Sequence, residues 1–361
     1  MHTRSQNRSS ISHEIRPVAS SGSDQTRFLA IDIGGANLKF YHAGGFAVSR
    51  IFPMWLRAHE LDAVIAEVAG TLAPVDAWGV TMTGEMADGF ENRADGVRVI
   101  VEQTMKAAAR FRISEVGFYA TSGSLLSPQE ATQNSRLVAS ANWHALSKWI
   151  ATWIDRPSLL VDVGSTTADL IPLSPGKVDT TSQTDFDRLC ADELVYLGIS
   201  RTPVCSLVDA LPVDDRWVPV MREWFASIDD CAIILGLVEE CAADNDTCDK
   251  RPRLKKHSVA RLARMVGLDG DDLTWPRLER MAKHVIESAR ERLARSAAKH
   301  ETHARSQWII SGHAKPLIEV PEGVPTIDLA DRLGTDVSRV APAYAICQMM
   351  QSGHLVARCA H

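Results

Sequence analysis

Two stretches of the sequence place an aspartate, glycines and small polar residues directly after an apolar run. The first is Asp32-Ile-Gly-Gly-Ala-Asn-Leu-Lys and the second is Asp162-Val-Gly-Ser-Thr-Thr-Ala-Asp. Glycine lets the backbone turn so closely that N–H groups face an anion, and the polar side chains that follow supply further donors. The stretches therefore predict two phosphate-binding turns, made of Gly34, Gly35, Asn37 and Lys39, and of Gly164, Ser165, Thr166 and Thr167.

The carboxylates of the same stretches suit a metal ion. Asp32, Asp162 and Asp169 have the chemistry to hold a hydrated Mg2+, which keeps several waters and takes one or two carboxylates. Ile309-Ile-Ser-Gly-His-Ala adds a third apolar run that ends in a glycine, Gly312. Taken singly, each stretch is also compatible with an ordinary turn and a capping aspartate. Three of them in this order favour a nucleotide or polyphosphate site.

The composition limits the classes of protein to which the chain can belong. Its 361 residues suggest two domains, and 45% hydrophobic with 23% charged residues is the balance of a soluble globular protein. A formal net charge of −6 argues against binding to nucleic acid or to an anionic membrane. No apolar run approaches the roughly 18 residues that span a bilayer. Seven irregularly spaced cysteines fit no zinc pattern and predict reduced thiols in the cytoplasm.

The spacing of apolar residues and the positions of glycine and proline predict the helices and strands that must position these turns. Residues 1–26 are polar, rich in Ser and Arg, and predicted to be a disordered extension. We expect a first domain at 27–156 and a second at 157–361, whose C-terminal helix could pack back on the first. Strands are expected around 28–35, 40–48, 77–83, 116–120, 158–173 and 307–314, and helices around 61–68, 139–153, 278–299 and 339–350. Residues 97–106 fit a strand or a helix, and a helix is favoured.

The paired turns resemble the phosphate-1 and phosphate-2 loops of the actin/hexokinase/Hsp70-type ATPase fold, and the turn at Gly312 resembles its adenosine-motif turn. The resemblance implies an α/β fold with two ribonuclease H-like domains facing a central cleft. Further segments resemble the hydantoinase A/oxoprolinase-like branch of that fold. They are Thr81-Met-Thr-Gly-Glu-Met-Ala-Asp, Ala139-Ser-Ala-Asn-Trp, Gly198-Ile-Ser-Arg-Thr-Pro-Val, Arg261-Leu-Ala-Arg-Met and Ala341-Pro-Ala-Tyr-Ala.

Within that branch, residues 27 to 350 resemble the short proteins linked to tetrahydromethanopterin C1 transfer and the archaeal methanofuran-biosynthesis synthases. The resemblance implies a transferase that joins a furanmethanol diphosphate to the phenol oxygen of a glutamyl-tyramine-type acceptor and expels diphosphate. Its partners would be these small molecules, with neither nucleic acid nor membrane. The oligomeric state is left open, a dimer among the alternatives.

The implied reaction gives the candidate residues their roles. Each phosphate turn would hold one end of the diphosphate, with Asp32 and Asp162 near Mg2+. A phenol with a pKa near 10 needs a base, for which Glu85 and Asp88 are the candidates and Asp169 the reserve. Arg201 would bind a substrate carboxylate or phosphate. Glu85 and Asp88 could equally cap a turn, and Arg201 could form an ion pair between domains.

Two other classes of function stay open. The loops alone also fit an ATP-dependent kinase or a hydantoinase/oxoprolinase-type hydrolase, in which case ATP would be the cofactor. A non-catalytic protein regulated by a nucleotide is the third class. The presence of Asp32, Lys39, Asp162 and Asp169 argues against it, because a degenerate site would be expected to lose some of them.

Overall fold

The computed structural model describes residues 27–72 and 74–356. These residues form two compact units, one holding the described residues up to Trp153 and from Leu333 on, the other Ile154–Arg332. The expected extension at residues 1–26 lies outside the described residues. The expected first domain, 27–156, ends close to where the first unit does, and the C-terminal helix that could pack back on the first domain belongs to the first unit, which the chain rejoins at Leu333.

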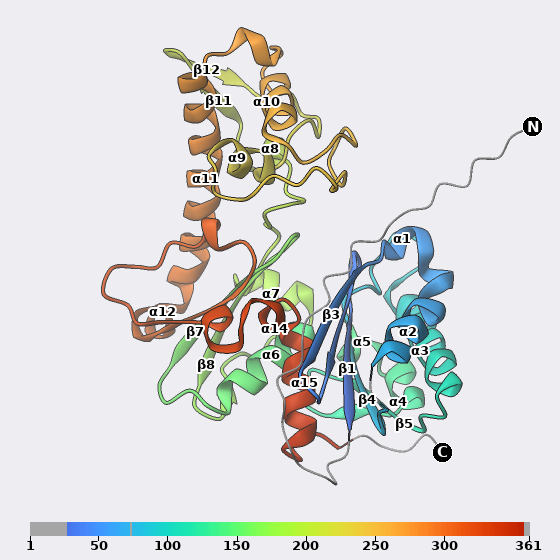
Figure 1. The fold of residues 1–361 in the computed structure, drawn as a ribbon. Helices are drawn as coiled ribbons and strands as arrows, with labels where there is room; N and C mark the ends of the chain where they lie inside the picture. The colour runs from blue at the N-terminus through green and yellow to red at the C-terminus, as the bar shows by residue number, and fades with distance from the viewer. Residues whose placement is uncertain (1–26, 73, 357–361) are drawn as a thin grey trace, which may run out of the picture. The chain divides into compact units, whose positions relative to one another are not determined.

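The first unit is built on a mixed sheet in the order β3-β2-β1-β4-β5-β6 (Figure 1). Strands β1 to β3 form antiparallel hairpins, and β4 and β5 run parallel to β1. Its strands are β1 Phe28–Ile33, β2 Asn37–His42, β3 Phe46–Ile51, β4 Ala77–Met82, β5 Glu115–Tyr119 and β6 Leu125–Leu126. Its helices are α1 Met54–Arg57, η1 Ala58–Glu60, α2 Leu61–Thr71, α3 Arg93–Arg110, α4 Pro128–Gln133, α5 Ser135–Val138, α6 Asn142–Ala151, α14 Thr335–Ser338 and α15 Ala341–Gln351.

The second unit repeats this plan with the order β10-β8-β7-β13-β14, and β9 also pairs with β8. Strand β8 is antiparallel to β7, whereas β13 and β14 are parallel to it and to each other. Its strands are β7 Ser158–Val163, β8 Ala168–Ser174, β9 Lys177–Val178, β10 Leu194–Val195, β11 Ala210–Val213, β12 Arg216–Pro219, β13 Trp308–Gly312 and β14 Thr326–Asp328. Its helices are α7 Asp185–Cys190, α8 Val204–Leu207, α9 Ile228–Ile234, α10 Lys255–Arg264, η2 Gly270–Asp272, α11 Trp275–Ala297, η3 Ala298–His300, α12 Glu301–Ser306 and η4 Lys315–Leu317; α13 Leu329–Leu333 ends at the boundary.

In both units a hairpin and two parallel strands flank the first strand, so the predicted fold class of two ribonuclease H-like α/β units is confirmed. Each unit has its own apolar core. The segment that fitted both a strand and a helix is helix α3, which Asn92 caps by accepting the N–H of Asp95. Helix α6 begins three residues later than expected because Ser140 has φ 50°, which an α-helix cannot contain.

The two faces of the first sheet differ in what they bury. Leu29, Ile31 and Ile33 of β1 belong to the apolar core formed with α2 and α3. Residues on the other face alternate with them, so Asp32 shares a face with Gly79 and Thr81 of β4. A Cβ atom on Gly79 would lie 2.6 Å from both Ile346 and Met350, so α15 packs directly on that face. Helix α15 therefore covers part of the face of the sheet to which Asp32 belongs.

Candidate functional site

The first glycine turn connects β1 and β2. The N–H of Gly34 donates to the carbonyl of Asn37 at 3.0 Å, which closes the turn. Asp32 and Lys39 occupy paired positions on the two strands, and Lys39 Nζ lies 3.5 Å from Asp32 Oδ2. The Lys39 side chain is 32% exposed, whereas that of Asp32 is 2% exposed. The turn thus presents a lysine to solvent beside a buried carboxylate.

The carboxylate of Asp32 is buried, and only one of its two oxygens has a partner among the described residues. Burial raises the pKa of its carboxyl group, while Lys39 and the side chain of Asn142 lower it. Asp32 Oδ1 has no hydrogen-bond partner among the described residues, and neither has the hydroxyl of Thr81, which is paired with Asp32 on the neighbouring strand. Buried polar atoms nearly always have partners, so these two atoms mark a place where a ligand, a cation or water would bind.

Glu85 lies beside the first turn, at the end of β4. The N–H groups of Thr83 and Gly84 both donate to the carbonyl of Ile33, at 2.9 and 3.0 Å, which brings the two strand ends together. Glu85 is fully buried, and its Oε1 accepts a hydrogen bond of 2.9 Å from the Ser140 hydroxyl. Asp88, the other candidate base, is exposed in the loop that follows. The structure therefore places Glu85, and not Asp88, in contact with an element that orients it.

The second glycine turn connects β7 and β8 and is closed in the same way, with the N–H of Gly164 donating to the carbonyl of Thr167 at 2.9 Å. The segment Gly198–Arg201 lies on it. The N–H of Ile199 donates to the carbonyl of Gly164 at 3.1 Å, and the N–H groups of Ser200 and Arg201 donate to that of Ser165 at 3.1 and 3.0 Å. The Arg201 side chain is exposed. Its backbone is thus fixed to the second glycine turn.

The third glycine turn meets the second. Gly312 has φ 83°, and a Cβ atom on it would lie 2.2 Å from the carbonyl oxygen of Val163 and 2.7 Å from Asp162 Oδ1. The N–H groups of His313 and Ala314 donate to that carbonyl at 3.2 and 3.1 Å. His313 Nε2 lies 3.1 Å from the Ser165 hydroxyl. Gly312 is therefore required both by its backbone conformation and by the space available.

Asp169 follows the second turn and forms an ion pair with Arg188, whose side chain is 3% exposed. Burial raises the pKa of the Asp169 carboxyl group; Arg188 opposes this effect and Asp185 adds to it. An ion pair competes with the role of base in which Asp169 was held in reserve. Arg188 was not among the predicted site residues, and no sequence pattern connects two residues so far apart that pair only through the fold.

The unsatisfied oxygen of Asp32 is compatible with a magnesium ion. Among the described residues no group of three or more His, Cys, Asp and Glu side chains could hold an ion without help. Mg2+ commonly takes only one or two carboxylates and fills its other positions with water and phosphate oxygens. The unsatisfied Oδ1 of Asp32 is suited to such an ion or to one of its waters. Asp162, the second predicted ligand, lies at the Gly312 turn.

The predicted site residues fall into two groups. The first unit brings together Asp32, Gly34, Gly35, Asn37, Lys39 and Glu85, and the second brings together Asp162, Gly164, Ser165, Thr166, Thr167, Asp169, Arg201 and Gly312. The roles of these residues remain predictions. Thr81 and Ser140 were not singled out by the sequence, although both stand in segments that carried the family resemblance. Only the structure distinguishes them: the buried hydroxyl of Thr81 has no partner among the described residues, and Ser140 has a positive φ.

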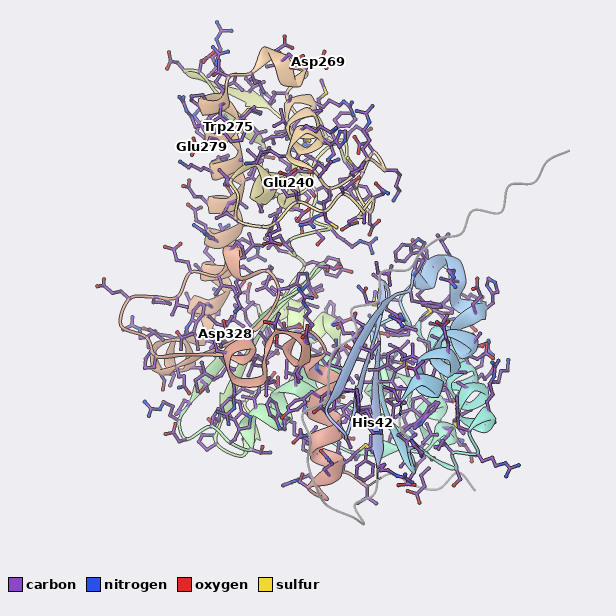
Figure 2. All side chains as sticks on the ribbon, in the orientation of Figure 1. His42, Glu240, Asp269, Trp275, Glu279 and Asp328 are labelled. Atoms are coloured by element: carbon purple, nitrogen blue, oxygen red, sulfur yellow. The ribbon has the colours of Figure 1, made fainter. Side chains whose placement is uncertain are left out.

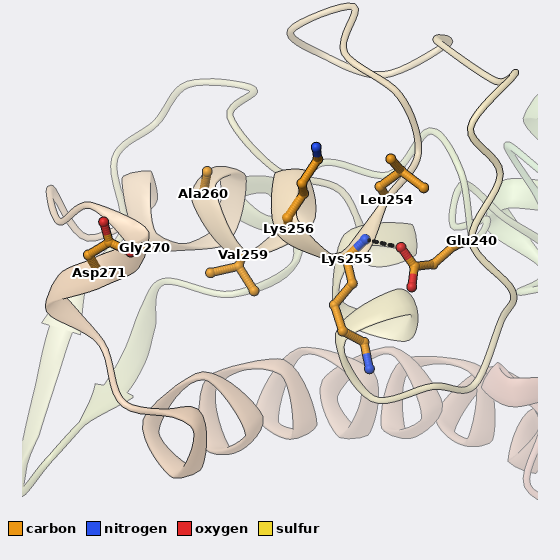
Figure 3. Close-up of a pocket in the computed structure, with 8 residues that line it drawn as sticks. All are labelled: Glu240, Leu254, Lys255, Lys256, Val259, Ala260, Gly270 and Asp271. Carbon is orange, nitrogen blue, oxygen red and sulfur yellow. Dashed lines mark hydrogen bonds between the residues drawn. The ribbon is translucent and has the colours of Figure 1, made fainter.

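A pocket of about 810 Å3 in the second unit contains none of these residues (Figure 3). It is lined by Glu240, Leu254, Lys255, Lys256, Val259, Ala260, Gly270 and Asp271. Glu240 Oε2 accepts the N–H of Lys255 at 2.7 Å and so occupies the start of α10. Figure 2 labels Glu240 and Asp269 near this pocket, and Asp328 at the other end of the unit, on β14. The pocket therefore belongs to a different part of the unit from the phosphate turn.

Comparison with known proteins finds relatives with similar sequences. The chain is 29% identical over 331 residues to the (4-{4-[2-(gamma-L-glutamylamino)ethyl]phenoxymethyl}furan-2-yl)methanamine synthase of Methanocaldococcus jannaschii, covering 90% of this chain and 97% of the relative. It is 26% identical over 214 residues to the synthase of the same name from Methanococcus vannielii, covering 57% of this chain and 96% of that one.

Within the described residues, no helix combines the length and the apolar character that a membrane span requires.

A nucleotide-free structure of acetone carboxylase is similar with a TM-score of 0.45 and 12% sequence identity, over 84% of this chain. The chain spans about half the length of that carboxylase chain, 50%. The family model described as hydantoinase/oxoprolinase matches residues 76–308, which is more than half of the chain and includes the segments around Glu85, the second glycine turn and Arg201. The chain belongs to the hydantoinase/oxoprolinase family.

Proposed function

We propose that this protein is a transferase of methanofuran-type coenzyme biosynthesis, in tetrahydromethanopterin-linked one-carbon metabolism. It would join a furanmethanol diphosphate to the phenol oxygen of a glutamyl-tyramine-type acceptor. The observation that carries this proposal is the similarity to the synthase of M. jannaschii, which extends over 90% of this chain and 97% of the relative. The name of that relative describes a phenoxymethyl-furan, which is the aryl ether that such a coupling forms.

In the proposed reaction, one bond between carbon and oxygen forms and another breaks. The phenol oxygen attacks the furfuryl carbon, and the bond from that carbon to diphosphate breaks, so that the electron pair leaves with diphosphate. The furan oxygen delocalises positive charge that develops on this carbon. The two glycine turns, with Lys39 on the first, would bind phosphate oxygens and stabilise the charge on the leaving group.

The acceptor phenol must lose its proton, and its ordinary pKa near 10 requires a general base at neutral pH. Glu85 is the base that we propose, because it lies at the first turn and its carboxylate is oriented by Ser140. Asp88 is exposed and Asp169 is paired with Arg188, so both are weaker candidates. Arg201, whose backbone is fixed to the second turn, would bind a carboxylate or phosphate of a substrate.

Mg2+ is the cofactor that we propose, with Asp32 of the first unit and Asp162 of the second as its predicted carboxylate ligands. When bound, it would neutralise charge on the leaving group. We also propose that the protein acts in the cytoplasm on small molecules, without nucleic acid or membrane; the six cysteines in the described residues are all free thiols. Whether it acts as a monomer or a dimer is decided by measuring its mass in solution.

The test is a coupling assay with the purified protein, the furan diphosphate, a glutamyl-tyramine acceptor and Mg2+. We expect equal amounts of aryl ether and diphosphate, detected by mass spectrometry and by a phosphate assay after pyrophosphatase. Formation of neither product would refute the proposal. If the protein instead converted ATP to ADP, either with transfer of the phosphoryl group to an acceptor or with release of phosphate and cleavage of an amide substrate, the ATP-dependent kinase or hydrolase would replace the transferase.

A further inference from the structure

Arg261 is a fully buried cation outside the glycine turns. It stands on α10, with a side chain that is 0% exposed. Its Nε donates to Asp230 Oδ1 at 2.7 Å and its Nη1 donates to Asp249 Oδ1 at 3.0 Å. Burying a charge costs free energy. Removing one member of a buried ion network therefore strongly destabilises the folded protein, because it leaves another charge buried without its partner. Its connections to the rest of the unit show what it fixes in place.

Asp230 connects Arg261 to the start of α9. Its Oδ2 accepts the N–H of Ser227 at 3.0 Å, which caps this helix, and its Oδ1 also accepts the hydroxyl of Ser258 at 2.8 Å. A carboxylate that caps a helix can rotate when nothing else binds it. Arg261 and Ser258 bind the other oxygen, so the orientation of the cap, and with it the position of Ser227, is fixed.

Thr202 connects the start of α9 to the Gly198–Arg201 segment. Its carbonyl accepts the N–H of Ile228 at 3.1 Å, directly after Ser227. Its hydroxyl oxygen accepts the N–H of Gly198 at 2.9 Å. Thr202 is 8% exposed, so water does not readily replace either bond. It is therefore held by α9 on one side and holds Gly198 on the other.

Gly198 is in contact with the second phosphate turn itself. A Cβ atom on it would lie 2.4 Å from Ser165 C and from Thr166 N. Its neighbour Ile199 donates to the carbonyl of Gly164 at 3.1 Å. The steps from Arg261 to the turn are thus an ion pair, hydrogen bonds, the peptide bond between Ser227 and Ile228, and a direct packing contact, all within one unit.

We propose that Arg261 is a positioning residue for the second phosphate turn, and that it acts through Asp230 and Thr202. It touches no substrate. It fixes the backbone of Gly198 and Ile199, which in turn fixes the conformation of Gly164–Thr167 and the place of Arg201. The choice of diphosphate as the ligand that this turn binds rests on the proposed function, whereas the coupling between Arg261 and the turn does not.

The first measurement is amide hydrogen exchange of the full chain without ligand, in the wild type and in Arg261→Met, Thr202→Val, Thr202→Ser and Arg253→Met. Arg253 is the matched control, because it binds Asp229, the neighbour of Asp230 on α9, with its Nε 2.5 Å from Asp229 Oδ2. We expect exchange at the amides of Gly198 and Ile199 to be at least tenfold faster in Arg261→Met and Thr202→Val. Thr202→Ser keeps the acceptor oxygen and should exchange like the wild type.

The second measurement is the Kd for inorganic diphosphate with Mg2+, determined by calorimetry well below the Tm of each variant. The same two variants should bind about tenfold more weakly, since small displacements of a binding group have effects of this size or larger. Arg253→Met is expected to lower the Tm but to change neither the exchange at these amides nor the Kd.

Wild-type exchange at Gly198 and Ile199 in Thr202→Val would overturn the proposal even if Arg261→Met failed to fold. A fall in Tm without any change in exchange or Kd would reduce Arg261 to a structural role. If exchange changes as expected but the wild type does not bind diphosphate, the positioning role stands and the proposed ligand is wrong.

Discussion

Gly198 and Ser165 lie so close together that no side chain can stand between them. A Cβ atom at position 198 would lie 2.4 Å from the carbonyl carbon of Ser165, well inside van der Waals contact. The neighbouring atoms are backbone and cannot turn away as the end of a flexible side chain would. The packing of these two residues therefore joins the Gly198–Arg201 segment to the second phosphate turn.

Gly198→Ala should displace the turn. We expect at least a tenfold loss in kcat/KM and in affinity for diphosphate, with a loss of stability of about 1–3 kcal/mol from overpacking. Steady-state kinetics and urea denaturation measure the two effects. Gly70→Ala is the control: it lies in α2, its Cβ would make an ordinary contact of 3.6 Å with Phe111, and it should keep full activity. Equal activity of both variants would show that the close contact does not matter for function.

Thr81→Val replaces a buried hydroxyl that has no partner among the described residues with a methyl group of similar size. We expect the stability of the free protein to be unchanged or to rise by up to about 1 kcal/mol, because no hydrogen bond is lost. Affinity for Mg2+ with diphosphate should fall about tenfold, as for other groups that assist a metal ligand, if the bound state supplies Thr81 and Asp32 with a partner. Calorimetric titration measures this affinity.

Thr104→Val is the matched control for Thr81→Val. Thr104 is equally buried, but its hydroxyl donates to the carbonyl of Ile100 at 2.7 Å. This variant should lose about 1 kcal/mol of stability and bind the ligands like the wild type. Unchanged binding in Thr81→Val as well would remove Thr81 from the site.

Removing the base should be tested on Glu85 and Asp88 in parallel. Glu85→Gln should lower kcat by about 10²-fold or more, while Asp88→Asn should change it only a few-fold, because Asp88 is an exposed side chain. A fluorinated tyramine acceptor, whose phenol is more acidic, should recover part of the activity of Glu85→Gln. The reverse order of the two variants would make Asp88 the base.

Much of this architecture follows from local pattern. The strand ends at Asp32 and Asp162, the amphipathic helix α11 and the paired glycine turns all have signals within a few residues. What the sequence does not contain is pairing at long range. Arg188 with Asp169, Ser140 with Glu85, and Arg261 with Asp230 meet only because the fold brings separate elements together. The start of helix α6 was predicted too early in the chain. The reason is local: Ser140 has a positive φ, which is uncommon for serine.

Asp32 should lower the stability of the free protein at neutral pH. Burial raises its pKa in the folded state above the ordinary 3.8, so the folded state binds this proton more tightly than the unfolded state. Stability due to this group therefore falls as the pH rises from 3.8 through the raised pKa. Asp32→Asn does not titrate, and it should be more stable than the wild type at pH 7 by a margin that shrinks toward pH 4. Urea denaturation across this range measures the margin.

The same Asp32→Asn variant should lose activity by about 10²-fold or more, because it removes the carboxylate proposed to bind Mg2+. Greater stability combined with lower activity is typical of a residue kept for function. Lower stability at every pH would instead make the Asp32–Lys39 pair a structural element.

His144 should make the protein sensitive to acid. Burial and the nearby Lys148 lower the pKa of its imidazole from 6.5 to about 4, and the Tyr119 hydroxyl lies 2.9 Å from Nδ1. The unfolded state thus binds a proton at a pH at which the folded state does not. Stability is fully present above pH 6.5 and is lost as the pH falls toward 4, by up to about 3 kcal/mol from this group. Urea denaturation at pH 7.5, 6 and 5 follows this loss.

His144→Gln should flatten the pH dependence of unfolding below pH 6.5, because its side chain does not titrate. His59→Gln, at an exposed histidine on the same unit, is the control and should keep the wild-type dependence. Tyr119→Phe separates the hydrogen bond from burial. Removing the hydroxyl leaves the imidazole buried, so this variant should be less stable at every pH and still lose stability in acid. If His144→Gln unfolded with the wild-type pH dependence, the acid sensitivity would have to come from other groups.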